Sequence, residues 1–300
     1  MNTTHEEPAQ AVARPEWLPT DVYPFHLRGI ELPSGQVTYV DEGEGPVLLF
    51  VHAGMWSFIF RDVITRLKDR YRCITLDFPG FGLSPGGSDQ PTLPAMSRTL
   101  GEFVTALGLD DVTVVAHDLG GLTALGWAAT EPERARAFVM ANTFTWTPDG
   151  IGLRTMLRLM SSKSITALGA ATNVVPRLTS TWFGVGRHLD DRERAAFLGP
   201  FQDPAKRRRF HRLMRSALDE TEHTERADTA IKAELHDRPI LTIFGERNDM
   251  FGFQKRHEAR FLNNRSLIIE KGNHFPMMDD PDLFAATLSE WWGSAVTDTQ

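Results

Sequence analysis

Short apolar stretches alternate with stretches of helical spacing along most of this chain. Four of the apolar runs are nearly continuous: Val47 to His52, Arg72 to Phe78, Val112 to His117 and Ala135 to Thr143. Strands that are apolar throughout are buried on both faces, as in a parallel sheet between two layers of helices. The alternation therefore predicts an α/β domain, and few other folds accommodate it.

The same rhythm extends beyond these four strands. A hairpin at the sheet edge is predicted by two short strands around the turn Pro33-Ser34-Gly35, namely Phe25 to Leu32 and Gln36 to Val40. Later in the chain, strands are predicted at Pro239 to Phe244 and Ser266 to Glu270. Helices are predicted at Ser57 to Arg70, Pro94 to Leu107, Leu122 to Thr130, Phe253 to Phe261 and Pro281 to Trp292.

The alternation is interrupted once. Between residues 146 and 236, helical stretches such as Gly152 to Met160, Asp191 to Leu198 and Pro204 to Glu220 follow one another without a buried strand. We predict that 146–236 is a helical cap inserted into a core formed by 17–145 and 237–300. Residues 1–16 offer little to bury and are predicted to be a flexible tail.

Composition narrows the class of protein. A chain of 300 residues with 41% hydrophobic composition can bury one large core, and its net charge of -7 gives no support for a nucleic-acid partner. The single cysteine, Cys73, lies in an apolar run and is expected to be buried. No stretch approaches the roughly 20 apolar residues that cross a bilayer. We expect a cytoplasmic monomer or homodimer without a membrane partner.

One basic run resembles a nucleic-acid patch when taken alone. Lys206 to Arg209, followed by Arg212 and Arg215, begins a predicted helix and is interleaved with apolar residues. This spacing is more typical of a solvated helix face. The sequence also has no cluster of metal ligands and no glycine-rich phosphate loop, so we expect no cofactor.

The most informative chemical feature is an aspartate at the end of a predicted strand. The segment Val112 to Gly121 passes from β-branched residues through Asp118 into a helix, which is the context of a nucleophile elbow. A carboxylate can displace a leaving group from an sp³ carbon and leave an ester that water hydrolyses. Asp118 is therefore a candidate nucleophile for attack at alkyl carbon.

Two further residues complete a hydrolytic set in the order nucleophile, acid, histidine. Asp249 follows the strand Pro239 to Phe244, and His274 follows the strand Ser266 to Glu270. Both therefore come at the carboxyl edge of the predicted sheet, where open α/β sheets bind ligands. An imidazole titrates near neutrality and can take a proton from water.

These features resemble the haloalkane dehalogenase and epoxide hydrolase branch of the α/β-hydrolase superfamily, and most of all haloalkane dehalogenases. The resemblance is carried by Tyr39 to Gly43, His52 to Arg61, Asp77 to Ser84, the pair His117-Asp118, and Asn142 to Phe144. It implies an α/β-hydrolase fold with a mostly parallel sheet of eight strands, helices on both faces and an inserted helical cap. It covers nearly the whole chain after the predicted tail.

The resemblance also implies a mechanism. Asp118 would form an alkyl ester with a small apolar substrate, and water activated by His274 would then attack that ester, with Asp249 orienting the imidazole. Backbone N–H groups of Leu119 and of Gly54 or Ala53 would hold the oxyanion, each contributing roughly 3 kcal/mol. The substrate pocket is predicted to include four aromatic residues: Trp56, Phe144, Trp182 and Phe183.

The chain departs from the family at three places. Haloalkane dehalogenases typically place tryptophan after the nucleophile as a halide donor, whereas this chain has Leu119, and where some use an asparagine in the oxyanion loop it has Gly54. The usual acid position, three residues after the glycine of its loop, holds Asn248, so Asp249 is the first choice of acid and Glu246 the second. An alternative acid position after the strand Ala135 to Thr143 is also neutral, with Asn142.

Two other functions therefore stay open. An epoxide hydrolase or a β-lactone-opening enzyme of the same branch would use the same nucleophile. Epoxide hydrolases commonly use cap tyrosines as the acid, but the tyrosines here, Tyr23, Tyr39 and Tyr71, all precede the nucleophile. A cap histidine such as His188 would then have to be the acid for an epoxide. A non-catalytic protein that binds a ligand on this fold is the alternative from another class.

Overall fold

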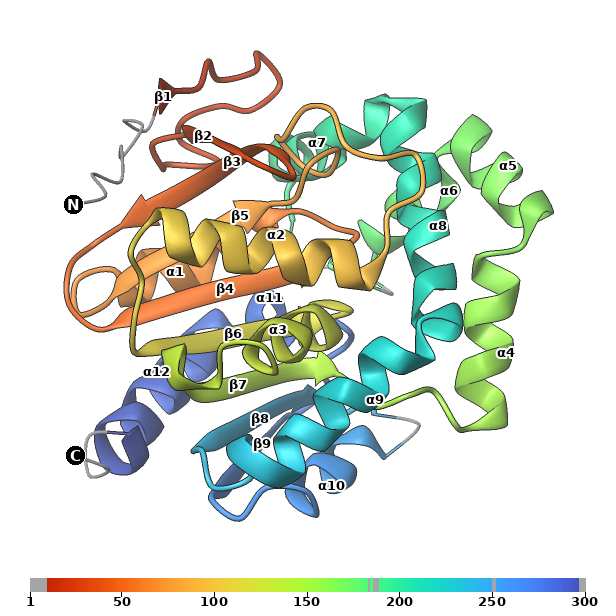
Figure 1. The fold of residues 1–300 in the computed structure, drawn as a ribbon. Coiled ribbons are helices and arrows are strands. Elements are labelled where there is room, and N and C mark those ends of the chain that lie inside the picture. Colours follow the sequence, from red (N-terminus) through yellow and green to blue (C-terminus); the bar gives the residue numbers. More distant parts are fainter. Residues whose placement is uncertain (1–9, 183, 186–188, 250–251, 297–300) are drawn as a thin grey trace.

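The computed structural model describes residues 10–182, 184–185, 189–249 and 252–296. Its centre is a nine-stranded sheet with the strand order β1-β2-β3-β5-β4-β6-β7-β8-β9 (Figure 1). The strands are β1 Gln10–Ala11, β2 Arg28–Leu32, β3 Gly35–Glu42, β4 Val47–Ala53, β5 Arg72–Asp77, β6 Val112–Asp118, β7 Ala135–Thr143, β8 Ile240–Gly245 and β9 Asn264–Ile269.

The pairing of the strands changes from antiparallel to parallel once across the sheet. β1, β2 and β3 are antiparallel neighbours and β3 is antiparallel to β5, whereas β5, β4, β6, β7, β8 and β9 are parallel. The predicted hairpin and the predicted parallel core are both present. The prediction of eight strands missed β1, because a pair of residues within a polar N-terminal segment carries no strand period.

Residues 10–16 fall in the predicted tail 1–16, but the structure places them against the body of the protein. Gln10 pairs with Gly29 across β1 and β2, and the guanidinium of Arg14 donates to the carbonyl oxygens of Tyr23 and Phe25. Trp17 packs edge-on against Trp56. The segment from residue 10 onward is therefore attached to the body of the protein.

Helices cover both faces of the sheet (Figure 1). On one face α1 packs against α11 and α12, and on the other α2 packs against α3, which in turn contacts α9. The bounds of these helices, and of α10 beside β8 and β9, are α1 Arg61–Leu67, α2 Leu93–Ala106, α3 Gly120–Ala128, α9 Thr221–Ala230, α10 Phe253–Glu258, α11 Pro276–Asp279 and α12 Pro281–Trp291. Short 3₁₀ segments span Ser57–Phe60, Pro132–Arg134 and Gly199–Gln202, and π-helical turns span Ile231–Leu235 and Trp292–Val296.

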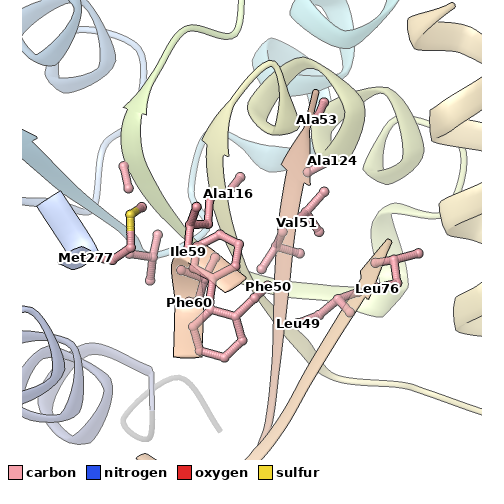
Figure 2. Close-up of a cluster of buried hydrophobic side chains, with 14 of the residues drawn as sticks. Leu49, Phe50, Val51, Ala53, Ile59, Phe60, Leu76, Ala116, Ala124 and Met277 are labelled. Carbon is pink, nitrogen blue, oxygen red and sulfur yellow. The ribbon is translucent and has the colours of Figure 1, made fainter. Parts of the chain in front are cut away.

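The central strands are buried as their composition predicts. In Figure 2, Phe50 of β4 and Ala116 of β6 lie beside Ile59, Phe60 and Met277, which come from the helical layer. Cys73 is free and buried in β5, and burial raises the pKa of its thiol. Close packing of these buried side chains holds the ends of the strands in place, and the candidate site lies at those ends.

The cap consists of helices that lie beyond the carboxyl ends of the parallel strands (Figure 1). Their bounds are α4 Ile151–Met160, α5 Lys163–Thr172, α6 Val174–Thr179, α7 Asp191–Leu198 and α8 Pro204–Asp219. α4 and α5 both pack against α8. The helix α9, which falls inside the range predicted for the cap, packs on α3 of the core instead.

The basic run at the start of α8 anchors the cap. Lys206 donates to the carbonyl oxygens of Gly82 and Ser84 in the core, and Arg209 donates to the carbonyl oxygen of Ser88. Arg207 is buried and donates to the carbonyl oxygen of Ala170. The predicted solvated face is thus only partly solvated, because several of its cations satisfy loop carbonyl groups.

A search of the described residues finds no helix that is both long enough and apolar enough to span a bilayer.

Candidate active site

Asp118 ends β6 in a left-handed backbone conformation, with φ of 52°. Such a conformation is strained for a residue with a side chain, and it turns the carboxylate out of the strand before α3 begins. Gly120 and Gly121 allow the turn, because a Cβ atom on Gly120 would lie 2.4 Å from the carbonyl oxygen of Val51 and one on Gly121 would lie 2.1 Å from Oγ1 of Thr143. The predicted strand, turn and helix are all present.

His274 faces Asp118 from the loop that follows β9. Its Nε2 atom lies 3.5 Å from Oδ2 of Asp118, and both side chains keep part of their surface exposed, 31% and 24% respectively. Burial raises the pKa of Asp118, but hydrogen bonding and charge from His274 outweigh that effect and the net pKa lies below its usual value. The fold thus keeps Asp118 ionised beside an imidazole.

An amide, rather than a carboxylate, stands on the other side of His274. The Oδ1 atom of Asn248 lies 2.9 Å from Nδ1 of His274 and also accepts from Nδ2 of Asn142 at 3.2 Å. Asn142 is fixed in turn, because it donates to the carbonyl oxygen of Asn273 and accepts from the backbone N–H of Gly245. The residue that faces the imidazole is therefore the one at the usual acid position, three residues after Gly245. The sequence favours Asp249 over Asn248 there only because Asn248 is neutral.

The structure does not bring Asp249 to His274. Its carboxylate accepts from the backbone N–H groups of Phe253 at 2.6 Å and Gln254 at 3.3 Å, at the beginning of α10. Burial raises its pKa more than these two bonds lower it. Glu246, the second choice, accepts from the backbone N–H of Lys271. Both carboxylates are engaged by backbone groups, which the chain order alone does not reveal.

The two other histidines near the site support its loops. His117 lies 2.9 Å from the carbonyl oxygen of His274 through Nε2, and burial lowers its pKa to about 3, so the ring is neutral. His52 lies 3.1 Å from Oδ1 of Asp77, whose carboxylate also accepts from the backbone N–H of Ser57. Both rings therefore have structural partners around the site.

The residues predicted for the oxyanion hole lie beside Asp118. The backbone N–H of Leu119 helps to lower the pKa of the Asp118 carboxyl group. Ala53 is the neighbour of Asp118 across β4 and β6, and Gly54 follows with φ of 94°. The side chain of Leu119 is fully buried and carries no donor. The structure thus brings the three backbone positions together at the ends of two adjacent strands.

A cavity of about 560 Å³ opens above Asp118, between the strand ends and the cap. Phe144 lines it as predicted. The polar side chains among its described lining residues are Asp118, Asn142, Thr179, Asn248 and His274. The rest of that lining is apolar or glycine and comes largely from the cap and from the loops after the strands. The shape and the lining suit a small apolar ligand.

Two predicted pocket residues, Trp56 and Trp182, are placed differently. Trp56 is fully buried outside the cavity lining, and its indole N–H donates to the carbonyl oxygen of Phe197 at 3.0 Å. Trp182 is 58% exposed and is not among the described lining residues, although its carbonyl oxygen accepts from Asn273. Phe183 lies outside the described residues, as does His188. The indole of Trp56 is therefore committed to the backbone and cannot also face a leaving group in this structure.

Comparisons with known proteins find relatives that match nearly the whole chain. Residues 48–287 match the model of the alpha/beta hydrolase family. The chain is 31% identical over 279 residues to "Haloalkane dehalogenase 2" of Mycobacterium tuberculosis, a match that covers 91% of this chain and 96% of that protein. It is 24% identical to "Cis-3-alkyl-4-alkyloxetan-2-one decarboxylase" of Xanthomonas campestris, over 89% of this chain and 95% of that protein.

The fold is shared with solved structures as well. The crystal structure of the haloalkane dehalogenase DbeA from Bradyrhizobium elkani is similar with a TM-score of 0.79 and 19% sequence identity, covering 91% of this chain and 99% of that one. Together with the family match over residues 48–287, this likeness confirms the predicted fold and the predicted resemblance. The chain belongs to the alpha/beta hydrolase family and is a haloalkane dehalogenase-like hydrolase.

Proposed function

We propose that the protein hydrolyses a small apolar substrate through a covalent ester on Asp118, as a haloalkane dehalogenase would. The observation that carries the proposal is the carboxylate of Asp118 at a strained turn, with its Oδ2 atom 3.5 Å from Nε2 of His274, in the lining of an apolar cavity. A carboxylate in such a place is suited to displacement at carbon, since the surrounding apolar lining carries few groups to solvate it.

The first half-reaction needs only Asp118. A carboxylate oxygen forms a bond to an sp³ carbon of the substrate, the bond from that carbon to the leaving group breaks, and the leaving group departs with the electron pair. Because the net pKa of Asp118 is lowered, the attacking group is ionised at neutral pH. The product of this step is an alkyl ester of Asp118.

The second half-reaction needs His274. Water attacks the carbonyl carbon of the ester while Nε2 takes its proton, and the backbone N–H groups of Leu119 and Gly54 or Ala53 hold the oxyanion. The ester bond to the alcohol then breaks, the alcohol takes up the proton, and Asp118 returns to its carboxylate form. Nε2 is free to accept the proton because Nδ1 faces the oxygen atom of Asn248.

A second candidate is the opening of a β-lactone, an oxetan-2-one ring. It is favoured by the similarity to the oxetanone decarboxylase and by the small number of polar groups in the described cavity lining, since a carboxylate leaving group needs less assistance than a halide. An epoxide is less well served, because the sequence places all three tyrosines before the nucleophile and so leaves the cap without one.

Mass spectrometry of a His274→Ala variant tests these candidates together. The variant keeps the nucleophile but lacks the base, so an ester should accumulate on the peptide that contains Asp118. Halide displacement adds the mass of the substrate less that of the hydrogen halide, whereas ring opening adds the full mass of the lactone or epoxide. The matched control is the double variant Asp118→Asn with His274→Ala, which should gain no mass.

The outcome separates the function classes. An adduct of either mass supports the covalent route and identifies the leaving group. No adduct from a panel of bromoalkanes, β-lactones and epoxides, combined with saturable binding of the same compounds, would favour the non-catalytic ligand-binding protein.

A further inference from the structure

The described surface concentrates its large apolar side chains on the outside of the cap. Six of the nine exposed ones lie between residues 151 and 182, and they form what we call the cap patch: Ile151, Met156, Leu159, Leu168, Leu178 and Trp182. Ile151 is 86% exposed and Leu159 is 60% exposed. A concentration of this kind on one part of a surface marks an interaction site, whereas scattered single residues do not.

Four of the six residues of the cap patch lie on two helices, α4 and α5. α4 and α5 pack on α8 and form the outermost layer of the molecule on that side (Figure 1). On α4 the buried side chains are Leu153 and Leu157, whereas Ile151 and Leu159 are exposed. This helix therefore carries apolar side chains toward the interior and also toward the outside.

The charge of this segment has a single sign. Residues 150–189 contain five arginine and lysine residues and no aspartate or glutamate, although the whole chain has a net charge of -7. Arg158, Lys163 and Arg177 are exposed among the side chains of the cap patch. The adjoining Asp149 is paired with Arg256 at 2.8 Å. The surface therefore combines apolar side chains with uncompensated positive charge.

The cap patch is continuous with the cavity. Met156 and Leu178 are 44% and 54% exposed, and both also line the cavity that holds Asp118. Apolar side chains are thus shared between the exposed surface of the cap and the lining of the cavity.

We propose that the cap patch binds an anionic lipid surface and that apolar substrate passes from the lipid into the cavity. Helices with exposed apolar side chains and basic residues lie in the interface of a bilayer, where the apolar groups enter the acyl boundary and the cations face anionic headgroups. The passage of substrate rests on the proposed function, whereas the binding to lipid does not. This revises the prediction of no membrane partner, which considered only segments long enough to span a bilayer.

The charge distribution disfavours a second copy of the chain as the occupant. A two-fold symmetric contact brings a patch against itself, so the cations of one copy would face the cations of the other. An anionic lipid surface, in contrast, offers a negative headgroup to each of these cations.

Flotation with lipid vesicles tests the proposal on the full chain. The protein should float with vesicles that contain phosphatidylglycerol and remain unbound with phosphatidylcholine alone, and salt should weaken the binding. Leu159→Glu and the double variant Arg158→Glu with Arg177→Glu should each bind about tenfold more weakly, because they remove an apolar anchor or reverse two charges. The matched control is Leu262→Glu, since Leu262 is 73% exposed but lies away from the cap, and it should bind as the unchanged protein does.

Three results would overturn the proposal. The first is absence of binding to anionic vesicles, and the second is equal binding to neutral and anionic vesicles. The third is self-association that Leu159→Glu abolishes in a protein that binds no vesicles, which would assign the cap patch to a second copy. Ester formation on Asp118 by a water-soluble substrate, measured on the same variants, keeps a failure of lipid binding distinct from a failure of the proposed function.

Discussion

The Nδ1 atom of His274 lies 2.9 Å from Oδ1 of Asn248, so a neutral amide occupies the place of a catalytic acid. The same oxygen accepts from Nδ2 of Asn142, which identifies it as an acceptor and the facing ring nitrogen as the one that carries the proton. Asn248 therefore fixes the orientation and tautomer of the imidazole without adding charge. In the proposed mechanism it is a positioning residue, and its neutrality leaves the imidazolium of the ester-hydrolysis step without a carboxylate partner.

Asn248→Asp should accelerate ester hydrolysis by about tenfold at alkaline pH, because a carboxylate stabilises the imidazolium that forms as water is deprotonated. The same charge favours the protonated ring, so the acidic limb of the pH–rate profile should move upward by about one unit or more. Asn248→Ala should slow hydrolysis by a similar factor and leave ester formation unchanged. Rapid-quench measurement of both half-reactions checks these effects. Equal changes in the two steps would contradict a positioning role.

Asp249 should contribute to stability rather than to catalysis. Asp249→Ala removes an acceptor from two backbone N–H groups of α10 and should cost about 1 kcal/mol of the free energy of unfolding. Asp249→Asn keeps an acceptor and removes a half-buried charge, so its stability should remain close to that of the unchanged protein. Urea denaturation measures both values. A change in the pH–rate profile of Asp249→Asn would show instead that this carboxylate serves His274.

Ester formation and ester hydrolysis should respond differently to pH. In the proposed mechanism Asp118 attacks as a carboxylate, and its lowered pKa keeps it ionised as the pH falls, whereas ester hydrolysis requires the unprotonated imidazole of His274. The ester should therefore accumulate in the unchanged protein at mildly acidic pH. Intact-mass analysis of quenched reactions across pH measures it. Loss of adduct at the same pH as loss of turnover would be the opposite result.

The lowered pKa of Asp118 also makes the stability of the fold depend on pH. The folded state binds a proton at this group less readily than the unfolded state does, so the group stabilises the fold above its usual pKa. That contribution is lost as the pH falls through the lowered value in the folded state.

Trp56→Phe should lower stability and leave substrate binding unchanged. The substitution leaves the buried carbonyl group of Phe197 without its donor, which costs about 1–3 kcal/mol. Phe144→Leu is the matched comparison, since Phe144 lines the cavity and its truncation should raise KM with little loss of stability. Denaturation and steady-state kinetics on both variants separate the two roles. A rise in KM for Trp56→Phe would place its indole at the substrate after all.

The sequence by itself determined the sheet and much of the site. The sequence predicts the strands Val47–Ala53, Val112–Asp118 and Ala135–Thr143 to within one residue at each end, because a fully buried strand must be apolar along its whole length. The positions of Asp118 and His274 followed from the same pattern, since the ends of parallel strands meet at one edge. The local pattern of apolar residues is enough to predict an element when its place in the sheet determines which of its side chains are buried.

The tertiary structure decided which atoms face one another. Asn248 and Asp249 are adjacent in a loop, and only the folded chain shows that the first faces the imidazole while the second accepts the amides of α10. Likewise, the sequence allows Trp56 either to line the cavity or to form a buried hydrogen bond. The folded chain decides for the hydrogen bond, because it brings the carbonyl oxygen of Phe197, 141 residues away, to the indole N–H. Side-chain direction in loops depends on contacts between distant segments, and no local period records them.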